Sequence, residues 1–103
     1  MPSPKGGIRA DCLHLKEQEI PYDHPHSSFM FTKQFVATQN AFHTFGIEVL
    51  LAGLLRLQAE ARKHDGLDYL QVFKNLCKAD FDGKDLWFIE DDVAVTALLP
   101  EDY

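Results

Sequence analysis

The segment from residue 47 to residue 64 constrains the fold most, because its apolar residues recur with the spacing of an α-helix. They form a wide apolar stripe, which consists of Ile47, Leu50, Leu51, Leu54, Leu55 and Leu57. Polar residues surround this stripe. The segment ends on Arg62, Lys63 and His64, which complement the negative end of a helix dipole, and Gly66 can take the left-handed cap. The pattern predicts a long amphipathic helix.

A second helix is predicted from about Ser28 to Phe45. Phe31, Phe35, Phe42 and Phe45 recur there at helical offsets, and Ser27 or Ser28 can accept the first free backbone N–H groups. Gly46 is expected to loosen or break the helical conformation between these two segments. A short third helix capped by Asp65 is suggested by Leu67, Leu70 and Phe73, although a strand over residues 67–76 is also possible.

Strands are expected at both ends of the chain. Residues 8–15 alternate apolar and polar side chains, whereas residues 16–26 carry Pro21 and Pro25 and read as a loop. Beyond Cys77, residues 77–81 and 85–89 flank Asp82-Gly83, a dipeptide typical of hairpin turns, and a third strand runs from Val93 to Ala97 before Pro100.

These elements predict the fold class α+β. We expect a single domain over residues 1–103, in which an N-terminal strand and two to three helices pack on a C-terminal three-stranded antiparallel meander. Residues 1–7 are rich in proline and glycine and are expected to form a disordered tail. A chain of 103 residues with 46% apolar side chains can build one core.

Charge and composition narrow the possible partners. The net charge is −6, and residues 80–103 contain eight carboxylates but only one lysine, Lys84. Such a surface repels phosphate backbones, so we expect no nucleic acid partner, whereas a protein partner is compatible with it. The longest apolar run, residues 49–55, is too short for a membrane span. Two cysteines far apart, Cys12 and Cys77, favour reduced thiols and a cytoplasmic location.

One short motif can bind metal. In an extended segment, His24 and His26 would lie on the same side, and Cys12 and His14 have the same spacing. If the strand over residues 8–15 lies beside this loop, the four side chains make a tetrahedral zinc set. The alternative is that Pro25 and the serines after it form a loop that leads into a helix, and this alternative implies no cofactor.

The aromatic residues suggest a surface. Phenylalanines between residues 29 and 45 spread over more of a helix than one core-facing stripe needs, and a small domain cannot bury all of them alone. The sequence carries no nucleophile elbow and no phosphate-binding loop. We therefore expect a small acidic interaction or regulatory module, homodimeric and without catalytic activity, whose contact residues are Phe31, Phe35, Phe42, Trp87, Asp91 and Asp92. Two alternatives stay open: a zinc protein or metal-dependent enzyme, and a binder of a small apolar ligand in a cleft lined by Phe31, Phe35, Phe42 and Trp87.

Overall fold

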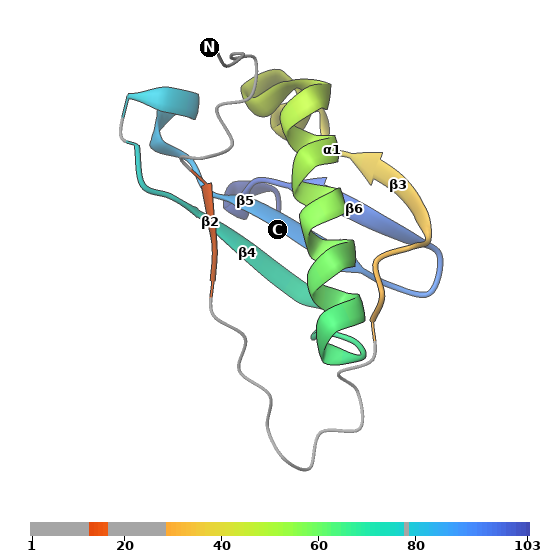
Figure 1. Ribbon diagram of the computed structural model, residues 1–103. Helices are drawn as coiled ribbons and strands as arrows, with labels where there is room; N and C mark the ends of the chain where they lie inside the picture. Colours follow the sequence, from red (N-terminus) through yellow and green to blue (C-terminus); the bar gives the residue numbers. More distant parts are fainter. Residues whose placement is uncertain (1–12, 17–28, 78) are drawn as a thin grey trace.

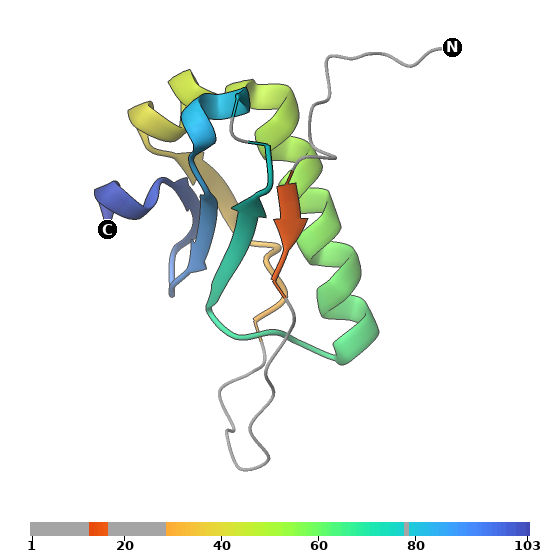
Figure 2. The ribbon, with the colours of Figure 1, turned by 90° about the vertical axis from the view of Figure 1, so that its left-hand side faces the viewer.

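The computed structural model describes residues 13–16, 29–77 and 79–103. Within these ranges the chain forms one α+β domain, in which a long helix lies on one side of a five-stranded mixed sheet (Figure 1). Figure 2 shows α1 on one side of the sheet and the C-terminal turn on the other. The predicted fold class is therefore confirmed, but the number and positions of the helices differ from the prediction.

The sheet has the strand order β2-β4-β5-β6-β3. The strands are β2 (Leu13–Leu15), β3 (Gln34–Ala37), β4 (Leu70–Asn75), β5 (Leu86–Glu90) and β6 (Ala94–Leu98). All neighbours are antiparallel except β3 and β6, which run parallel. Figure 1 shows α1 crossing in front of this sheet.

Helix α1 spans Gln39–His64. It begins at Thr38, whose hydroxyl accepts a hydrogen bond from the Ala41 N–H at 3.1 Å. Gly46 interrupts the helix with φ 81°, a value that favours glycine, and the predicted break is confirmed. The helix ends at Asp65, which takes the left-handed conformation that we expected of Gly66. The predicted helix over residues 47–64 is confirmed.

The core lies between α1 and the sheet. A Cβ atom at Gly53 would meet the ring of Phe88 at 3.1 Å and that of Phe73 at 3.5 Å, so α1 approaches the sheet closely there. Successive strand residues point to opposite faces, which places Trp87 on the sheet face turned away from α1. The largest fully buried side chains are Phe31, Phe88, Leu50, Leu57, Leu67, Leu86, Leu99 and Val95.

The predicted helix from Ser28 to Phe45 is wrong over residues 29–38, and Ser28 itself lies outside the described residues. Phe31 lies in a loop with φ 59°, and Gln34–Ala37 form the edge strand β3. The spacing of Phe31 and Phe35 fits a helix, but the alternation of Phe35 and Ala37 with more exposed neighbours has the period of a strand. The described residues therefore contain one α-helix instead of the expected two to three. The region of the proposed third helix forms strand β4.

The C-terminal antiparallel run of three strands is confirmed, with one correction. Its first strand is β4 (Leu70–Asn75), whereas the predicted strand over 77–81 is replaced by a loop and a 3-10 turn, η2 (Asp80–Gly83). Phe81 and Asp82 both adopt positive φ in η2. Of the predicted N-terminal strand, residues 13–15 form β2; residues 8–12, the proposed tail and the loop over 17–26 lie outside the described residues.

A second 3-10 turn, η3 (Pro100–Asp102), ties the segment after β6 to the start of α1. The Asp102 carboxylate accepts hydrogen bonds from the Thr38 hydroxyl and the Asn40 amide, both at 2.7 Å, and from the Leu99 N–H at 3.1 Å. The Thr38 bond contributes most, and together these bonds lower the pKa of Asp102 below its ordinary value because they favour the ionised carboxylate.

We expect Asp102→Asn to weaken the dependence of stability on acid pH. A carboxyl with a lower pKa in the folded protein stabilises fully above the unfolded pKa of about 3.9, and this contribution is lost as pH falls through the folded pKa. The variant should be less stable than wild type at neutral pH, and its stability should fall less steeply below about pH 4. Urea denaturation across this range measures both effects.

The control is Asp92→Asn, which changes the charge equally at an exposed residue with no side-chain hydrogen bond to the described part of the chain. An equally shallow acid profile in this control would contradict the role of Asp102.

Candidate interaction surface

The outward side of α1 carries an apolar stripe, although the opposite side of the helix is already packed on the sheet. We call it the α1 stripe, and it consists of Ile47, Leu51, Leu55 and Ala59. Ile47, Leu51 and Leu55 are 46%, 43% and 63% exposed. Residues four apart lie above one another on the same side of a helix. A helix that is apolar on both sides is typical of an element covered on both sides.

Two charges of opposite sign flank the α1 stripe. Glu48 follows Ile47 near its N-terminal end, and Arg62 lies three residues beyond Ala59 on the same side of the helix. Both side chains are exposed, and neither makes an ion pair within the described residues. In contrast, Glu60 contacts both Arg56 at 3.5 Å and His64 at 3.3 Å.

The sequence pattern includes Ile47, Leu51 and Leu55 in one wide apolar stripe, but it does not include Ala59 and does not separate exposed from buried residues. The predicted wide stripe divides in the structure into two sides: Leu50, Leu54 and Leu57 are buried, whereas Ile47, Leu51 and Leu55 are exposed. The width of the predicted stripe already indicated a second apolar side, because a helix that covers one face of a sheet needs only one narrower apolar side.

The aromatic residues proposed as a contact surface or ligand cleft do not gather at one place. Phe31 is fully buried, which corrects its expected role at a surface. Phe35 is half-buried and stacks on Phe88 with ring centres 6.3 Å apart. Phe42 is 48% exposed on α1 before the break at Gly46. Trp87 lies on β5 and points to the sheet face opposite to that of Phe88. It therefore lines no cleft together with Phe35, which packs on Phe88.

The sheet face turned away from α1 is a second, less exposed apolar surface. Leu70, Ile89, Thr96 and Val36 lie side by side across its strands. Trp87 packs against Tyr103 with ring centres 5.7 Å apart, and its Nε1 is buried without a hydrogen-bond partner in the described part of the chain. Tyr69 shares a side-chain hydrogen bond with Tyr103, which raises the pKa of Tyr69.

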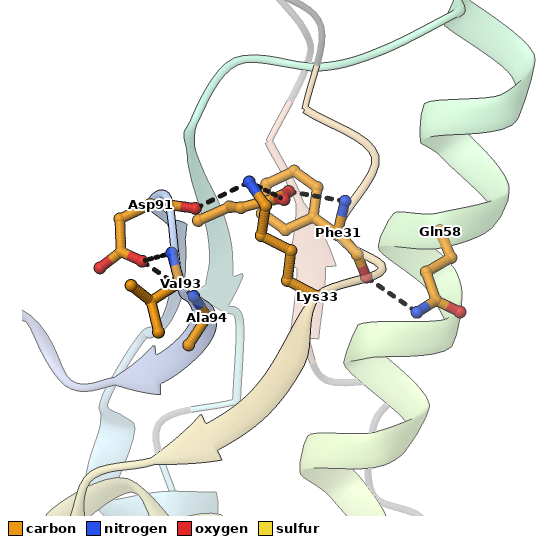
Figure 3. Close-up of polar contacts among 7 residues, drawn as sticks. Phe31, Lys33, Gln58, Asp91, Val93 and Ala94 are labelled. Atoms are coloured by element: carbon orange, nitrogen blue, oxygen red, sulfur yellow. Dashed lines mark hydrogen bonds and ion pairs between the residues drawn. The ribbon is translucent and has the colours of Figure 1, made fainter.

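A buried carboxylate holds the loop before β3 against the sheet (Figure 3). The Phe31 N–H donates to Oε1 of Glu90 at 2.7 Å, and Lys33 lies 3.1 Å from Oε2 of the same carboxylate. On the other side of the loop, the Gln58 amide of α1 donates to the Phe31 carbonyl at 2.8 Å. Glu90 is only 5% exposed. With its acceptors occupied, this cluster stabilises the loop and offers no free group for chemistry.

Asp91 and Asp92 lie in the exposed turn between β5 and β6. Asp91 caps this turn, because its Oδ1 accepts hydrogen bonds from the N–H groups of Val93 at 2.8 Å and Ala94 at 2.9 Å (Figure 3). These two bonds, together with the charge of Lys33, lower the pKa of Asp91. The carboxylate of Asp91 therefore has a structural role, and Asp92 alone of the two is free of such contacts among the described residues.

A small cavity lies between α1, β2 and β4. Its volume is about 90 Å³, and it is lined by Leu13, Val49, Ala52, Gly53, Arg56 and Phe73. Pockets for small ligands usually enclose about 300 Å³ or more. This cavity is too small for such a ligand, and it contains none of the aromatic residues that the sequence suggested.

Of the four proposed zinc ligands, His14 alone lies in the described part of the chain. Cys12, His24 and His26 lie outside the described residues, and His14 is exposed on β2. Within the described ranges, no three histidine, cysteine or acidic side chains approach closely enough to hold a metal ion.

The expectation of reduced thiols is wrong for Cys77, which is disulfide-bonded. The only other cysteine of the chain, Cys12, lies outside the described residues. Disulfides persist mainly in oxidising compartments.

None of the helices in the described ranges combines the length and hydrophobicity that a membrane span requires.

Comparison with known proteins gives no match for this chain, whether to a protein-family model, to a curated protein or to a solved structure.

Proposed function

We propose that this chain is a small acidic interaction module, without catalytic activity of its own, that associates with a second copy of itself through the α1 stripe. The observation that carries the proposal is the exposure of Ile47, Leu51 and Leu55 in one row on the outward side of α1. Single exposed apolar residues are common on any protein, but a contiguous row on a regular element marks an interaction surface.

A second copy suits this surface because the row is regular and self-complementary. Apolar side chains four residues apart form ridges, and the ridges of one helix pack into the grooves between those of another. In a two-fold symmetric dimer the same surface contributes from both chains, so every apolar contact occurs twice.

We expect Leu51→Glu to weaken self-association by at least about 100-fold. Burying the exposed half of Leu51 contributes roughly 1 kcal/mol in each chain, and a carboxylate in an apolar contact adds a desolvation cost on top of that loss. Together these effects exceed the 2.8 kcal/mol or so that corresponds to 100-fold in a dissociation constant. Sedimentation velocity over a dilution series measures the constant for wild type and variant.

The matched control is Val93→Glu, which places the same charge on an apolar residue that is 74% exposed in the β5–β6 turn. It should dimerise like wild type. The proposal fails if wild type stays monomeric up to concentrations of about 100 µM, which is a weak affinity for a specific complex, or if Leu51→Glu dimerises as wild type does.

The other predictions from the sequence stay separate proposals. A zinc site at Cys12, His14, His24 and His26 requires a reduced Cys12, and it would show as a zinc-dependent rise in the melting temperature of the reduced protein. For the compartment, the sequence favours the cytoplasm, whereas the disulfide at Cys77 favours an oxidising one. Alkylation of Cys77 in intact cells distinguishes these two.

A further inference from the structure

We infer that the two copies pack their α1 helices antiparallel across a two-fold axis, with Glu48 of each chain facing Arg62 of the other. This inference rests on the proposed self-association and adds the orientation of the partner and the charges that select it. The antiparallel arrangement follows from the positions of four residues on one helix face and of two charges at its ends.

The α1 stripe fixes where the axis passes. Its residues extend from Ile47 to Ala59, and an axis through the middle of this span buries the whole stripe. Ile47 of one chain then lies opposite Ala59 of the other, and Leu51 lies opposite Leu55. The large Ile47 meets a small residue in this register, while the two leucines fill the centre, so the surfaces complement each other in size as well as in polarity.

The flanking charges decide between the antiparallel and the parallel orientation. In the antiparallel register, Glu48 of one chain lies opposite Gln58 of the other, so that Arg62 is four residues, or about 6 Å along the axis, away, and the pair occurs twice. In a parallel pair, the two Glu48 side chains would meet at one end and the two Arg62 side chains at the other, and like charges repel. The basic last turn of α1, with Lys63 and His64 beside Arg62, strengthens this preference, as do the helix dipoles.

No competing contact within the described residues removes either charge from this role. Glu48 and Arg62 are exposed and make no ion pair there, whereas Glu60 is already engaged by Arg56 and His64. Exposed pairs of this kind contribute little affinity individually, but they set orientation and exclude wrong partners.

The test uses two charge reversals, Glu48→Arg and Arg62→Glu, in the full chain. In the antiparallel dimer each single variant brings like charges together at both ends, so self-association should weaken about tenfold. An equimolar mixture of the two variants places opposite charges at both ends again, and the double variant Glu48→Arg/Arg62→Glu does the same. Both should return to within about threefold of the wild-type dissociation constant, measured by sedimentation velocity.

A parallel dimer gives a different result: the single variants would associate as wild type does, and their mixture would associate more tightly than wild type. Either of these observations overturns the antiparallel inference. If all four proteins dimerise equally and Leu51→Glu still dissociates, the orientation is wrong while the proposed function stands. If wild type does not dimerise, the proposed function itself fails.

Discussion

Replacing Glu90 with alanine should lower the free energy of unfolding by about 3 kcal/mol, the larger part of which comes from one buried hydrogen bond. Oε1 of Glu90 accepts from the Phe31 N–H at 2.7 Å, and no other acceptor for this N–H is present among the described residues. Phe31 is fully buried and has φ 59°, a conformation that is strained for a phenylalanine. Without Glu90, this strained loop would keep an unsatisfied donor in the core.

Glu90→Gln separates the hydrogen bond from the charge. The glutamine carbonyl can still accept from Phe31, and the variant loses only the interaction with Lys33, whose side chain is 40% exposed and stays solvated. We expect this variant to be destabilised by about 1 kcal/mol, because partly exposed ion pairs contribute little. A buried acceptor and an exposed charge partner thus predict unequal effects for two substitutions at one position.

Urea denaturation at a fixed protein concentration measures these differences. The substitutions are best made in the Leu51→Glu background, because dimerisation would otherwise add a concentration-dependent term to stability. Asp92→Ala is the control, since Asp92 is exposed beside the same turn, and it should change stability by less than about 0.5 kcal/mol. Equal losses in Glu90→Ala and Glu90→Gln would show that the charge, and not the bond to Phe31, holds the loop.

The elements that sequence reasoning placed well are those determined by local pattern. The helix over residues 47–64 has a repeated apolar spacing and a basic last turn, and both signals lie within the helix itself. Strands β5 and β6 likewise contain continuous apolar and β-branched residues between polar turns, and both begin within one residue of the predicted positions. In these segments the local preference and the final structure agree.

The segment from Phe29 to Thr38 was misread because its conformation depends on distant residues. Its phenylalanines fit helical offsets, but the loop at Phe31 is held by Glu90, which is 59 residues away in the sequence. Among the described strands, β3 pairs with β6 alone, and this parallel pairing brings together residues about 60 positions apart. Such contacts leave no local signal, so propensity and periodicity gave the wrong element.

The candidate surface was only partly predictable for a similar reason. The sequence shows that α1 has more apolar positions than one packed side needs, but it does not show which of them the sheet covers. That assignment follows from the close approach at Gly53, which turns Leu50 and Leu57 toward the core and leaves Leu51 and Leu55 outside. The aromatic residues nominated from the sequence were instead distributed between the core, α1 and the far face of the sheet.

Gly53→Leu should destabilise the protein by about 3 kcal/mol or more, because it overpacks the contact between α1 and the sheet. A Cβ atom added at Gly53 would lie only 3.1 Å from two atoms of the Phe88 ring. Phe88 is fully buried and packs edge-to-face against Phe73, with ring centres 5.7 Å apart, so the ring has little room to move. The larger side chain can be accommodated only if α1 moves away from β5.

Gly46→Ala is the matched comparison, because position 46 requires glycine for its backbone conformation and not for lack of space. Its φ of 81° strains any other residue, but a Cβ atom there would meet nothing within 4 Å. Its cost should be about 1–3 kcal/mol, because φ 81° with ψ 158° lies in a backbone region that is essentially restricted to glycine. Gly53→Ala should lie near zero, since about 1 kcal/mol of helix propensity offsets a contact that is a few tenths of an ångström too close.

A double-mutant cycle with Phe88→Leu tests whether space is the cause at Gly53. The smaller leucine removes the ring atoms that the new side chain would meet, so Gly53→Leu should be tolerated better in that background, with a coupling energy of about 1–2 kcal/mol. The same cycle with Gly46→Ala should be additive, because a Cβ atom at Gly46 would have no atom of Phe88 or of any other neighbour among the described residues within 4 Å. Additive losses at Gly53 would mean that α1 does not rest on Phe88, and the outward direction of the α1 stripe would then lose its structural basis.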